Sequence, residues 1–162
     1  MEQEAFLNLW RSYDRLRALE DALFARHDLT AQQYNALRLL AAEHPATLPT
    51  LRVAGRLISR APDITRLLDK LAERGLVERR RQDGNRRVVQ VGITQAGLKL
   101  LARLAAPVRR CHQRQLGHMQ PAELRDLITL LEAARRPHDA KPGAPQESAA
   151  ADRNQDGSHE PR

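Results

Sequence analysis

Apolar residues recur at helical spacing in the middle of the chain, and polar residues fill the opposite side. Within 61–74 one helical face carries Ile64, Leu67, Leu68 and Leu71. The opposite face carries Pro62, Thr65, Arg66, Asp69 and Lys70. Ser59 suits the N-terminal cap, and Gly75 suits the residue that ends the helix. The pattern predicts a short amphipathic helix with a largely cationic outer face.

After this helix the pattern predicts a hairpin. Leu76 and Val77 begin one strand, and 88–91 form the returning strand. Gly84 and Asn85, which tolerate a positive φ, mark the turn between them after Asp83. The hairpin carries five arginines, which are Arg79, Arg80, Arg81, Arg86 and Arg87. A cationic helix followed by a basic hairpin is typical of a winged helix-turn-helix, a DNA-binding unit.

Three helices are expected before the cationic helix. The first ends near residue 26, and its apolar stripe is long enough to pair with another long helix, including one from a second subunit: Phe6, Leu9, Tyr13, Leu16 and Leu23. The second starts with a capping box of Thr30 and Gln33 and ends before the break at 44–45. Thr47 is expected to cap a third, shorter helix that extends through Leu57.

Two helices are expected after the hairpin. Thr94 starts a long one, with a kink expected at Pro107. Its apolar stripe is Leu101, Leu104, Val108 and Cys111. After a break at 116–118, Pro121 fits the first turn of the last helix. That helix has an apolar face of Leu124, Leu127, Ile128 and Leu131.

This order predicts a mainly α fold with a small β wing. We expect a dimerisation helix at 1–28, a winged helix-turn-helix at 29–97, dimerisation helices at 98–136 and a tail at 137–162. The tail contains no Ile, Leu, Val, Met or aromatic residue. Because such a segment buries too little apolar surface to offset its ordering entropy, we expect it to be disordered.

The charge and the cysteine count narrow the class of protein. A formal net charge of +7 favours a polyanionic partner, nucleic acid first and acidic membrane second. The acidic N-terminus is unlike a signal peptide, no apolar run reaches the about 20 residues of a membrane span, and a single cysteine fits a reducing cytosol. We expect a cytoplasmic protein without a membrane partner. Since there is no phosphate loop, metal-ligand pair or nucleophile motif, we expect neither an enzyme nor a cofactor.

The amphipathic helix would lie in the major groove with its outer face towards the base edges. Arg66, at the centre of this face, is the expected guanine contact, because Arg can donate two hydrogen bonds to that base. Ser59 and Thr65 could reach a base or a phosphate. Asp63 could accept a hydrogen bond from cytosine, but the better interpretation is an acidic residue in the first turn of the helix, where it satisfies exposed backbone amides and the helix dipole. Lys70 and Arg74 are expected to contact phosphates or solvent.

In the wing, Arg86 could enter a narrow minor groove. Asp83 or Asn85 would orient it. The expected DNA contacts are therefore, on the helix, Ser59, Arg60, Pro62, Asp63, Thr65, Arg66 and Lys70, and, in the wing, Arg79, Arg80, Arg81, Asp83, Asn85, Arg86 and Arg87.

These residues resemble the MarR family of bacterial transcriptional regulators over about 6–135. The matching motifs are Leu29-Thr30-x-x-Gln33-Tyr34, Ser59-Arg60-Ala61-x-x-Ile64-Thr65-Arg66-Leu67-x-Asp69-x-Leu71, Gly75-Leu76-Val77-x-Arg79, Asp83-x-x-Arg86-Arg87-Val88-Val89 and Ile93-Thr94-x-x-Gly97. The resemblance implies a homodimer on double-stranded DNA at a pseudo-palindromic operator. It also implies a repressor that a small ligand or oxidation releases. Asn85 stands where such members often have an acidic residue.

The resemblance further implies an effector pocket between the dimerisation helices and the winged lobe. Its candidate lining is Trp10, Tyr13, Arg17, Tyr34 and Arg38. The two arginines suggest an aromatic acid as the ligand. Cys111 lies on an apolar stripe and is interpreted as a buried structural thiol. His112 and His118 lack further ligands nearby in sequence, so no metal site is expected.

Two other functions stay open at this point. The protein could be a non-specific architectural DNA binder, or a winged-helix module that binds proteins and no DNA. The ordered helix with its central Arg66 favours a sequence-specific regulator.

Removal of the tail tests the division of the chain. A truncation after Pro137 should still dimerise, because the tail has no apolar residues to bury in an interface. Size-exclusion chromatography with light scattering checks this, and a monomeric truncation would contradict it.

Overall fold

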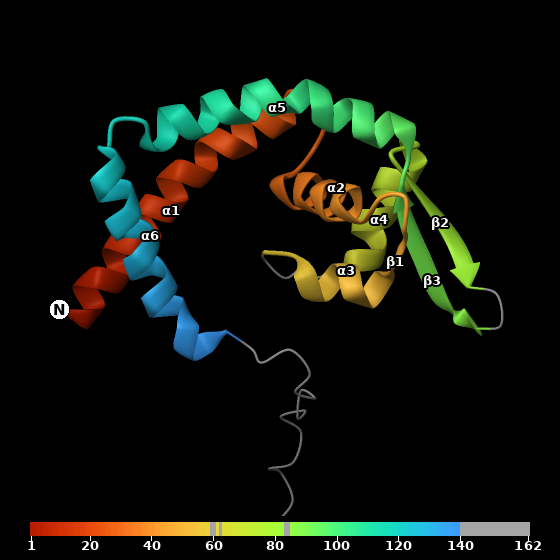
Figure 1. Ribbon diagram of the computed structural model, residues 1–162, viewed down its shortest axis with the longest axis horizontal. Coiled ribbons are helices and arrows are strands. Elements are labelled where there is room, and N and C mark those ends of the chain that lie inside the picture. The colour runs from red at the N-terminus through yellow and green to blue at the C-terminus, as the bar shows by residue number, and fades with distance from the viewer. Residues whose placement is uncertain (59–60, 62, 83–84, 140–162) are drawn as a thin grey trace, which may run out of the picture. The chain divides into compact units, whose positions relative to one another are not determined.

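The computed structural model describes residues 1–58, 61, 63–82 and 85–139 and divides the chain into two compact units. The first, Met1–Met119, contains α1 (Glu2–Ala25), α2 (Ala31–Glu43), β1 (Leu48–Pro49), α3 (Thr50–Arg56), α4 (Ile64–Glu73), β2 (Val77–Gln82), β3 (Asn85–Ile93) and α5 (Gln95–Leu116) (Figure 1). The second contains α6 (Pro121–Arg135) and the 3-10 turn η1 (Arg136–His138). The expected class, mainly α with a small β wing, is confirmed.

The start of α2 follows the predicted capping box. The Thr30 hydroxyl accepts a hydrogen bond from the Gln33 backbone N–H at 3.2 Å, and the Gln33 side chain accepts from the Thr30 N–H at 2.9 Å. The rings of Phe24 and Tyr34 stack at 4.6 Å between centroids, across the turn from α1 to α2. These contacts fix the angle at which the first helix meets the lobe that follows.

The prediction for the third helix is wrong at its start. Leu48 and Pro49 form a short strand, β1, which pairs with β3, and α3 begins only at Thr50. The Thr47 hydroxyl bonds to the side chain of Gln90 at 3.3 Å instead of capping a helix. Pro49 is compatible with an edge strand, because a proline there forfeits no N–H to the sheet.

The sheet is antiparallel with the strand order β1-β3-β2. Val77 lies opposite Ile93, and Arg79 lies opposite Val91. The three apolar members of these pairs are buried. The residues of the hairpin turn, 83–84, lie outside the described part of the chain.

The amphipathic helix α4 begins later than predicted. Its N-cap is Asp63, whose Oδ1 accepts a hydrogen bond from the Arg66 N–H at 2.9 Å, and Ile64 is the first helical residue. Ser59, the expected cap, lies outside the described residues. Gly75, with a φ of 65°, follows the end of the helix as predicted.

The predicted apolar face of α4 is confirmed. Leu67, Leu68 and Leu71 are buried in the main core with residues of α2, α3, the sheet and α5. Because three leucines on one side of the helix are fixed in this way, the opposite face of α4 points away from the core.

The helix α5 passes over α1 and α2 and closes the core (Figure 1). Thr94 caps it, and it continues through Pro107. The buried stripe differs by one residue from the prediction: Leu100 is buried with Leu104 and Val108, whereas Leu101 is half-buried. Spacings of four along a helix keep these three on one face.

The second unit has a helix with an uncovered apolar side. Its first residue is Pro121, as predicted, and the Glu123 carboxylate accepts from the Gln120 N–H at 2.7 Å. Within α6 no residue is buried, and Ile128 and Leu131 of the predicted apolar face are 55% and 37% exposed. The apolar face predicted for this helix is therefore not buried within the described residues.

Two glycines provide a matched test of this packing. A Cβ on Gly97 would collide with the Leu76 carbonyl oxygen and lie 2.6 Å from Ile93 Cγ1, whereas a Cβ on Gly55 would meet nothing within 4 Å. We expect Gly97→Ala to destabilise the fold by about 1–3 kcal/mol. Gly55→Ala should stabilise it by about 0.5–1 kcal/mol, because alanine favours the helix. Denaturant unfolding measures both, and equal effects would contradict the close approach at Gly97.

Candidate nucleic-acid interface

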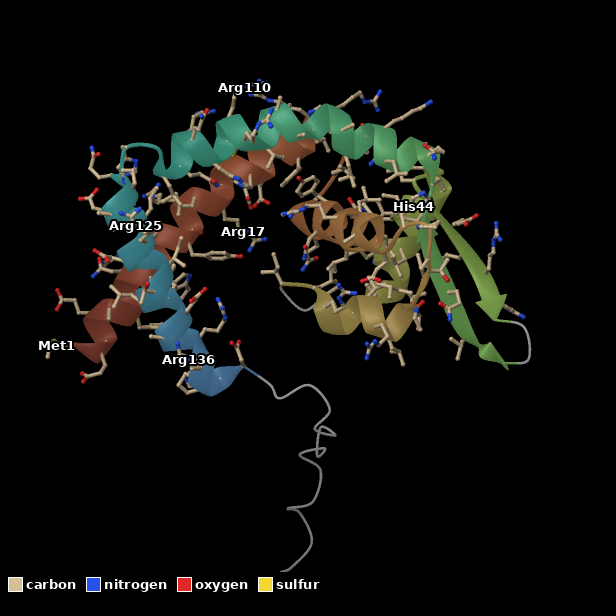
Figure 2. All side chains as sticks on the ribbon, in the orientation of Figure 1. Met1, Arg17, His44, Arg110, Arg125 and Arg136 are labelled. Atoms are coloured by element: carbon tan, nitrogen blue, oxygen red, sulfur yellow. The ribbon has the colours of Figure 1, made fainter. Side chains whose placement is uncertain are left out.

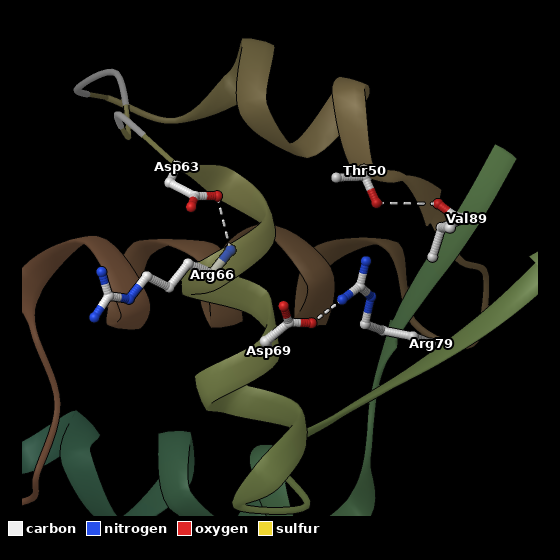
Figure 3. Close-up of polar contacts among 6 residues, drawn as sticks. All are labelled: Thr50, Asp63, Arg66, Asp69, Arg79 and Val89. Atoms are coloured by element: carbon white, nitrogen blue, oxygen red, sulfur yellow. Dashed lines mark hydrogen bonds and ion pairs between the residues drawn. The ribbon is translucent and has the colours of Figure 1, made fainter. Parts of the chain in front are cut away.

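The outer face of α4 is exposed and mostly polar. Thr65, Arg66 and Lys70 are all exposed on it. The Arg66 guanidinium forms no hydrogen bond or ion pair with the described residues, although its backbone N–H is held by Asp63 (Figure 3). The backbone of Arg66 is therefore fixed by the cap while its side chain stays available. The Asp63 carboxylate satisfies a backbone amide of the first turn, as the sequence interpretation expected, but it does so as the N-cap, the position predicted for Ser59.

The arginines of β2 fall on two faces of the sheet. Successive strand residues alternate between faces, so Arg79 shares the side of buried Val77, and Arg80 lies on the other side. The Arg80 side chain is 74% exposed, and its guanidinium pairs with Glu78 at 3.0 Å. Arg81 is also exposed. Arg80 and Arg81 therefore present positive charge to the surroundings.

Arg79 differs from its neighbours. Its side chain is only 23% exposed, and its Nη1 forms an ion pair with Oδ1 of Asp69 on α4 (Figure 3). The sequence prediction grouped Arg79 with the other wing arginines as a DNA contact. In the structure the Arg79 guanidinium lies against α4.

A second long-range contact also involves an arginine expected on the surface. The Arg74 guanidinium donates hydrogen bonds to the backbone carbonyls of Asp28 and His27, the latter at 3.0 Å. These carbonyls belong to the turn between α1 and α2. No sequence pattern indicated this contact, because its acceptors are backbone atoms 46 and 47 residues away.

Several predicted DNA contacts lie beyond the side chains that the structure describes. Ser59, Arg60, Pro62 and Asp83 lie outside the described residues. Asn85, Arg86 and Arg87 belong to β3, but their side chains lie outside the described part. On β2 and β3 a shallow basic groove of about 300 Å³ is lined by Arg79, Arg80, Arg81 and Val89.

The five effector candidates fall into two groups. Trp10 and Tyr13 line an open groove of about 500 Å³ on α1 together with Phe6 and Leu9. Arg17 lies over the Tyr13 ring at 5.9 Å and pairs with Asp21 at 3.2 Å. Tyr13 and then Asp21 raise the pKa of Arg17.

The second group lies on α2. Tyr34 is half-buried beside Phe24, and Arg38 is exposed. Burial raises the pKa of Tyr34, and the positive charge of Arg38 opposes this shift. The aromatic residues of α1 thus line an apolar groove, whereas Tyr34 is part of the packing between α1 and α2.

Cys111 is a buried thiol, as the sequence indicated. It is 7% exposed, and burial, followed by the charge of Glu20, raises its pKa. His112, next to it, faces Glu20 with 3.4 Å between Nε2 and Oε1. Within the described ranges no three His, Cys, Asp or Glu side chains gather as metal ligands. None of the helices described is long and apolar enough to cross a membrane.

A helix with a cationic outer face, held by two other helices beside a basic antiparallel hairpin, defines a winged helix-turn-helix DNA-binding protein. Comparison with known proteins gives the family. Residues 29–89 match the MarR family. A MarR transcription factor from Planctomyces limnophilus is 56% identical over 82% of this chain and 96% of that one, with a TM-score of 0.68. The chain belongs to the MarR family and is a DNA-binding transcription regulator.

More distant structures share the fold. BpsR from Bordetella bronchiseptica, whose DNA binding is regulated by 6-hydroxynicotinic acid, is 24% identical over 82% of this chain and 91% of that one, with a TM-score of 0.70. A mutant MarR from E. coli, in complex with operator DNA, is 23% identical over 78% of this chain and 89% of that one, with a TM-score of 0.69.

The environment of Cys111 gives a prediction about its reactivity. A buried thiol with a raised pKa holds less thiolate at pH 8 than a free one, so modification by a disulfide reagent should be at least about ten-fold slower than in unfolded protein. Absorbance at 412 nm, with and without guanidinium, measures this rate. Equal rates would contradict a structural role.

Proposed function

We propose that this regulator is a homodimeric repressor that binds a pseudo-palindromic operator through α4 and is released by a small-molecule ligand. The observation that carries the proposal is the outer face of α4. Arg66 is anchored by its backbone to the Asp63 cap, and its guanidinium is free of described partners. A fixed helix with a free Arg at its centre suits the reading of a guanine edge in the major groove.

The other residues of α4 and the wing would contact different parts of the DNA. Thr65, beside Arg66, would reach a base or a phosphate, and Lys70 would neutralise a phosphate. Arg80 and Arg81 on the exposed wing would add positive charge along the flanking backbone. Arg86, by its place after the hairpin turn, would enter the minor groove.

The dimer is supported by an uncovered apolar surface on α1. Phe6, Leu9, Trp10 and Tyr13 are each at least 47% exposed and lie at helical spacing. Soluble monomers rarely expose such contiguous patches, whereas interfaces between subunits bury them. We therefore assign dimerisation to segments 1–28 and 98–136. Two α4 helices would then lie about 34 Å apart, one turn of DNA.

The ligand class follows by analogy with BpsR, which responds to an aromatic acid. The groove on α1 supplies aromatic walls, and Arg17 supplies a cation over the Tyr13 ring. An aromatic carboxylate would suit both. Isothermal titration with a panel of such acids, followed by DNA release, tests this assignment.

Binding to selected and random DNA separates this proposal from its rivals. A duplex enriched from a random-sequence library by the wild-type protein should bind about 10³-fold or more tightly than a scrambled duplex. An architectural protein would bind both alike, and a protein-interaction module would bind neither.

Arg66→Ala tests whether the outer face of α4, with Thr65, Arg66 and Lys70, is the face that reads the DNA sequence (the reading face). It should weaken binding to the selected duplex by about 1–3 kcal/mol and reduce discrimination at one base pair in each half-site. Arg86→Ala should weaken binding with a smaller effect on major-groove preference. Fluorescence anisotropy measures both.

The control is Arg110→Ala. Arg110 lies in the segment assigned to dimerisation, but it projects from α5 on the side away from α1 (Figure 2), and light scattering shows whether this variant remains a dimer. It removes the same charge and should leave affinity nearly unchanged. If Arg66→Ala behaved like this control, the reading face would be assigned wrongly.

A further inference from the structure

The ion pair between Asp69 and Arg79 joins the reading helix to the root of the wing. Asp69 lies on α4 one turn after Arg66, and its side chain is 47% exposed. Arg79 reaches it from β2 (Figure 3). The wing is separately attached to α3 on its other strand, where the Thr50 hydroxyl donates to the Val89 carbonyl at 3.2 Å. The Asp69–Arg79 pair thus adds a link between the wing and the helix that carries Arg66.

The carboxylate of Asp69 is a problem for a surface that binds DNA. A negative charge at this position would repel phosphates. It also stands three residues after Arg66, the spacing at which Asp and Arg pair along a helix. Left alone, Asp69 could therefore engage the guanidinium that is expected to reach a base.

Arg79 removes both difficulties. Its positive charge neutralises Asp69, and its position on β2 draws the carboxylate towards the sheet. Figure 3 shows Asp69 facing Arg79 while the Arg66 side chain extends in another direction.

Arg79 is also poorly placed to contact DNA itself. Its side chain is largely covered, and its Nε is buried without a partner among the described residues. To reach a phosphate it would have to leave Asp69 and expose that carboxylate on the reading helix. The exposed Arg80 is also paired with a carboxylate, that of Glu78, but Glu78 lies on the wing strand β2 and not on α4.

We propose that Arg79 is a positioning residue for DNA recognition: it keeps the Asp69 carboxylate away from Arg66 and from the phosphates, and it does not contact DNA. The inference rests on the proposed function, in which α4 reads the operator. It separates the wing arginines into those that bind phosphate and one that acts through Asp69.

Asp69→Asn and Arg79→Gln, made singly and together, test the proposal. Arg79→Gln should weaken binding to the selected duplex about ten-fold, because Asp69 becomes free. Adding Asp69→Asn should restore affinity to within about three-fold of wild type, because the harmful carboxylate is gone. The double variant keeps the net charge of the wild type, so its salt dependence can be compared directly.

The matched control is the exposed pair on the same strand, Glu78 and Arg80. Glu78→Gln with Arg80→Gln also conserves net charge but removes an expected phosphate contact. In this control the slope of log K against log salt should fall by about 0.9 for each phosphate that is no longer neutralised, and it should be unchanged in Asp69→Asn/Arg79→Gln. Anisotropy titrations between 50 and 200 mM salt, on the selected and scrambled duplexes, give these slopes.

Three results would overturn the proposal: no loss of affinity in a folded Arg79→Gln, failure of Asp69→Asn to restore it, or a reduced salt slope in the double variant. Circular dichroism shows whether each variant folds. If Arg79→Gln alone does not fold, the double variant Asp69→Asn/Arg79→Gln decides. A double variant with the affinity and salt slope of the wild type supports a positioning role for Arg79. A double variant that binds DNA more weakly and with a smaller salt slope indicates that Arg79 contacts a phosphate. Arg66→Ala distinguishes a failure of this proposal from a failure of the proposed function. If Arg66→Ala did not weaken DNA binding, α4 would not read the operator, and the proposed function itself would be wrong.

Discussion

The burial of one face of α4 is the constraint on which the remaining geometry depends. Leu68 and Leu71 are fully buried and Leu67 nearly so, and these side chains meet α2, α3, the sheet and α5 in one core. Rolling the helix by even a quarter turn would expose about two leucines, at about 1.5–3 kcal/mol each. The direction in which Arg66 points is therefore set by residues that never contact a ligand.

Charge is arranged on this framework according to burial. Exposed arginines such as Arg66 and Arg81 are available to a polyanion, whereas Arg74 and Arg79 are occupied by acceptors of the protein itself. A net charge of +7 does not distinguish the two kinds. The basic surface that DNA would meet is therefore smaller than the count of arginines implies, and it is more sharply defined.

Local signals were sufficient to predict much of the fold. The capping box at Thr30, the stop at Gly75 and the start at Pro121 depend on a few consecutive residues, and each is found where the sequence placed it. The strand β1 was missed because two residues are too few to show an alternating apolar pattern. The pairing partner of Leu48 is Val91, 43 positions later, so no local signal indicates the pairing. The start of α4 was misplaced because Asp63 and Ser59 are equally good caps by sequence, and only the path of the chain selects between them.

The features of the candidate site likewise fall into those that local sequence patterns predict and those that depend on contacts between distant residues. The cationic face of α4 followed from its period, since the buried leucines determine what is left outside. The role of Arg79 did not follow, because it depends on Asp69 across a strand and a helix. The effector residues could only be placed by resemblance. Tyr34 proves to be engaged with Phe24, an aromatic neighbour that no short-range pattern links to it.

The contact between Arg74 and the turn after α1 determines which substitutions the turn tolerates at residues 27 and 28. Its acceptors are the main-chain oxygens of His27 and Asp28, so the bond does not depend on which side chains stand there. At residue 27 the sequence can drift without loosening the reading helix. Residue 28 is limited by shape instead, because its φ of 51° suits Asp, Asn or Gly far better than a branched residue. The side chains of the turn can thus be substituted while the hydrogen bonds from Arg74 to its backbone are retained.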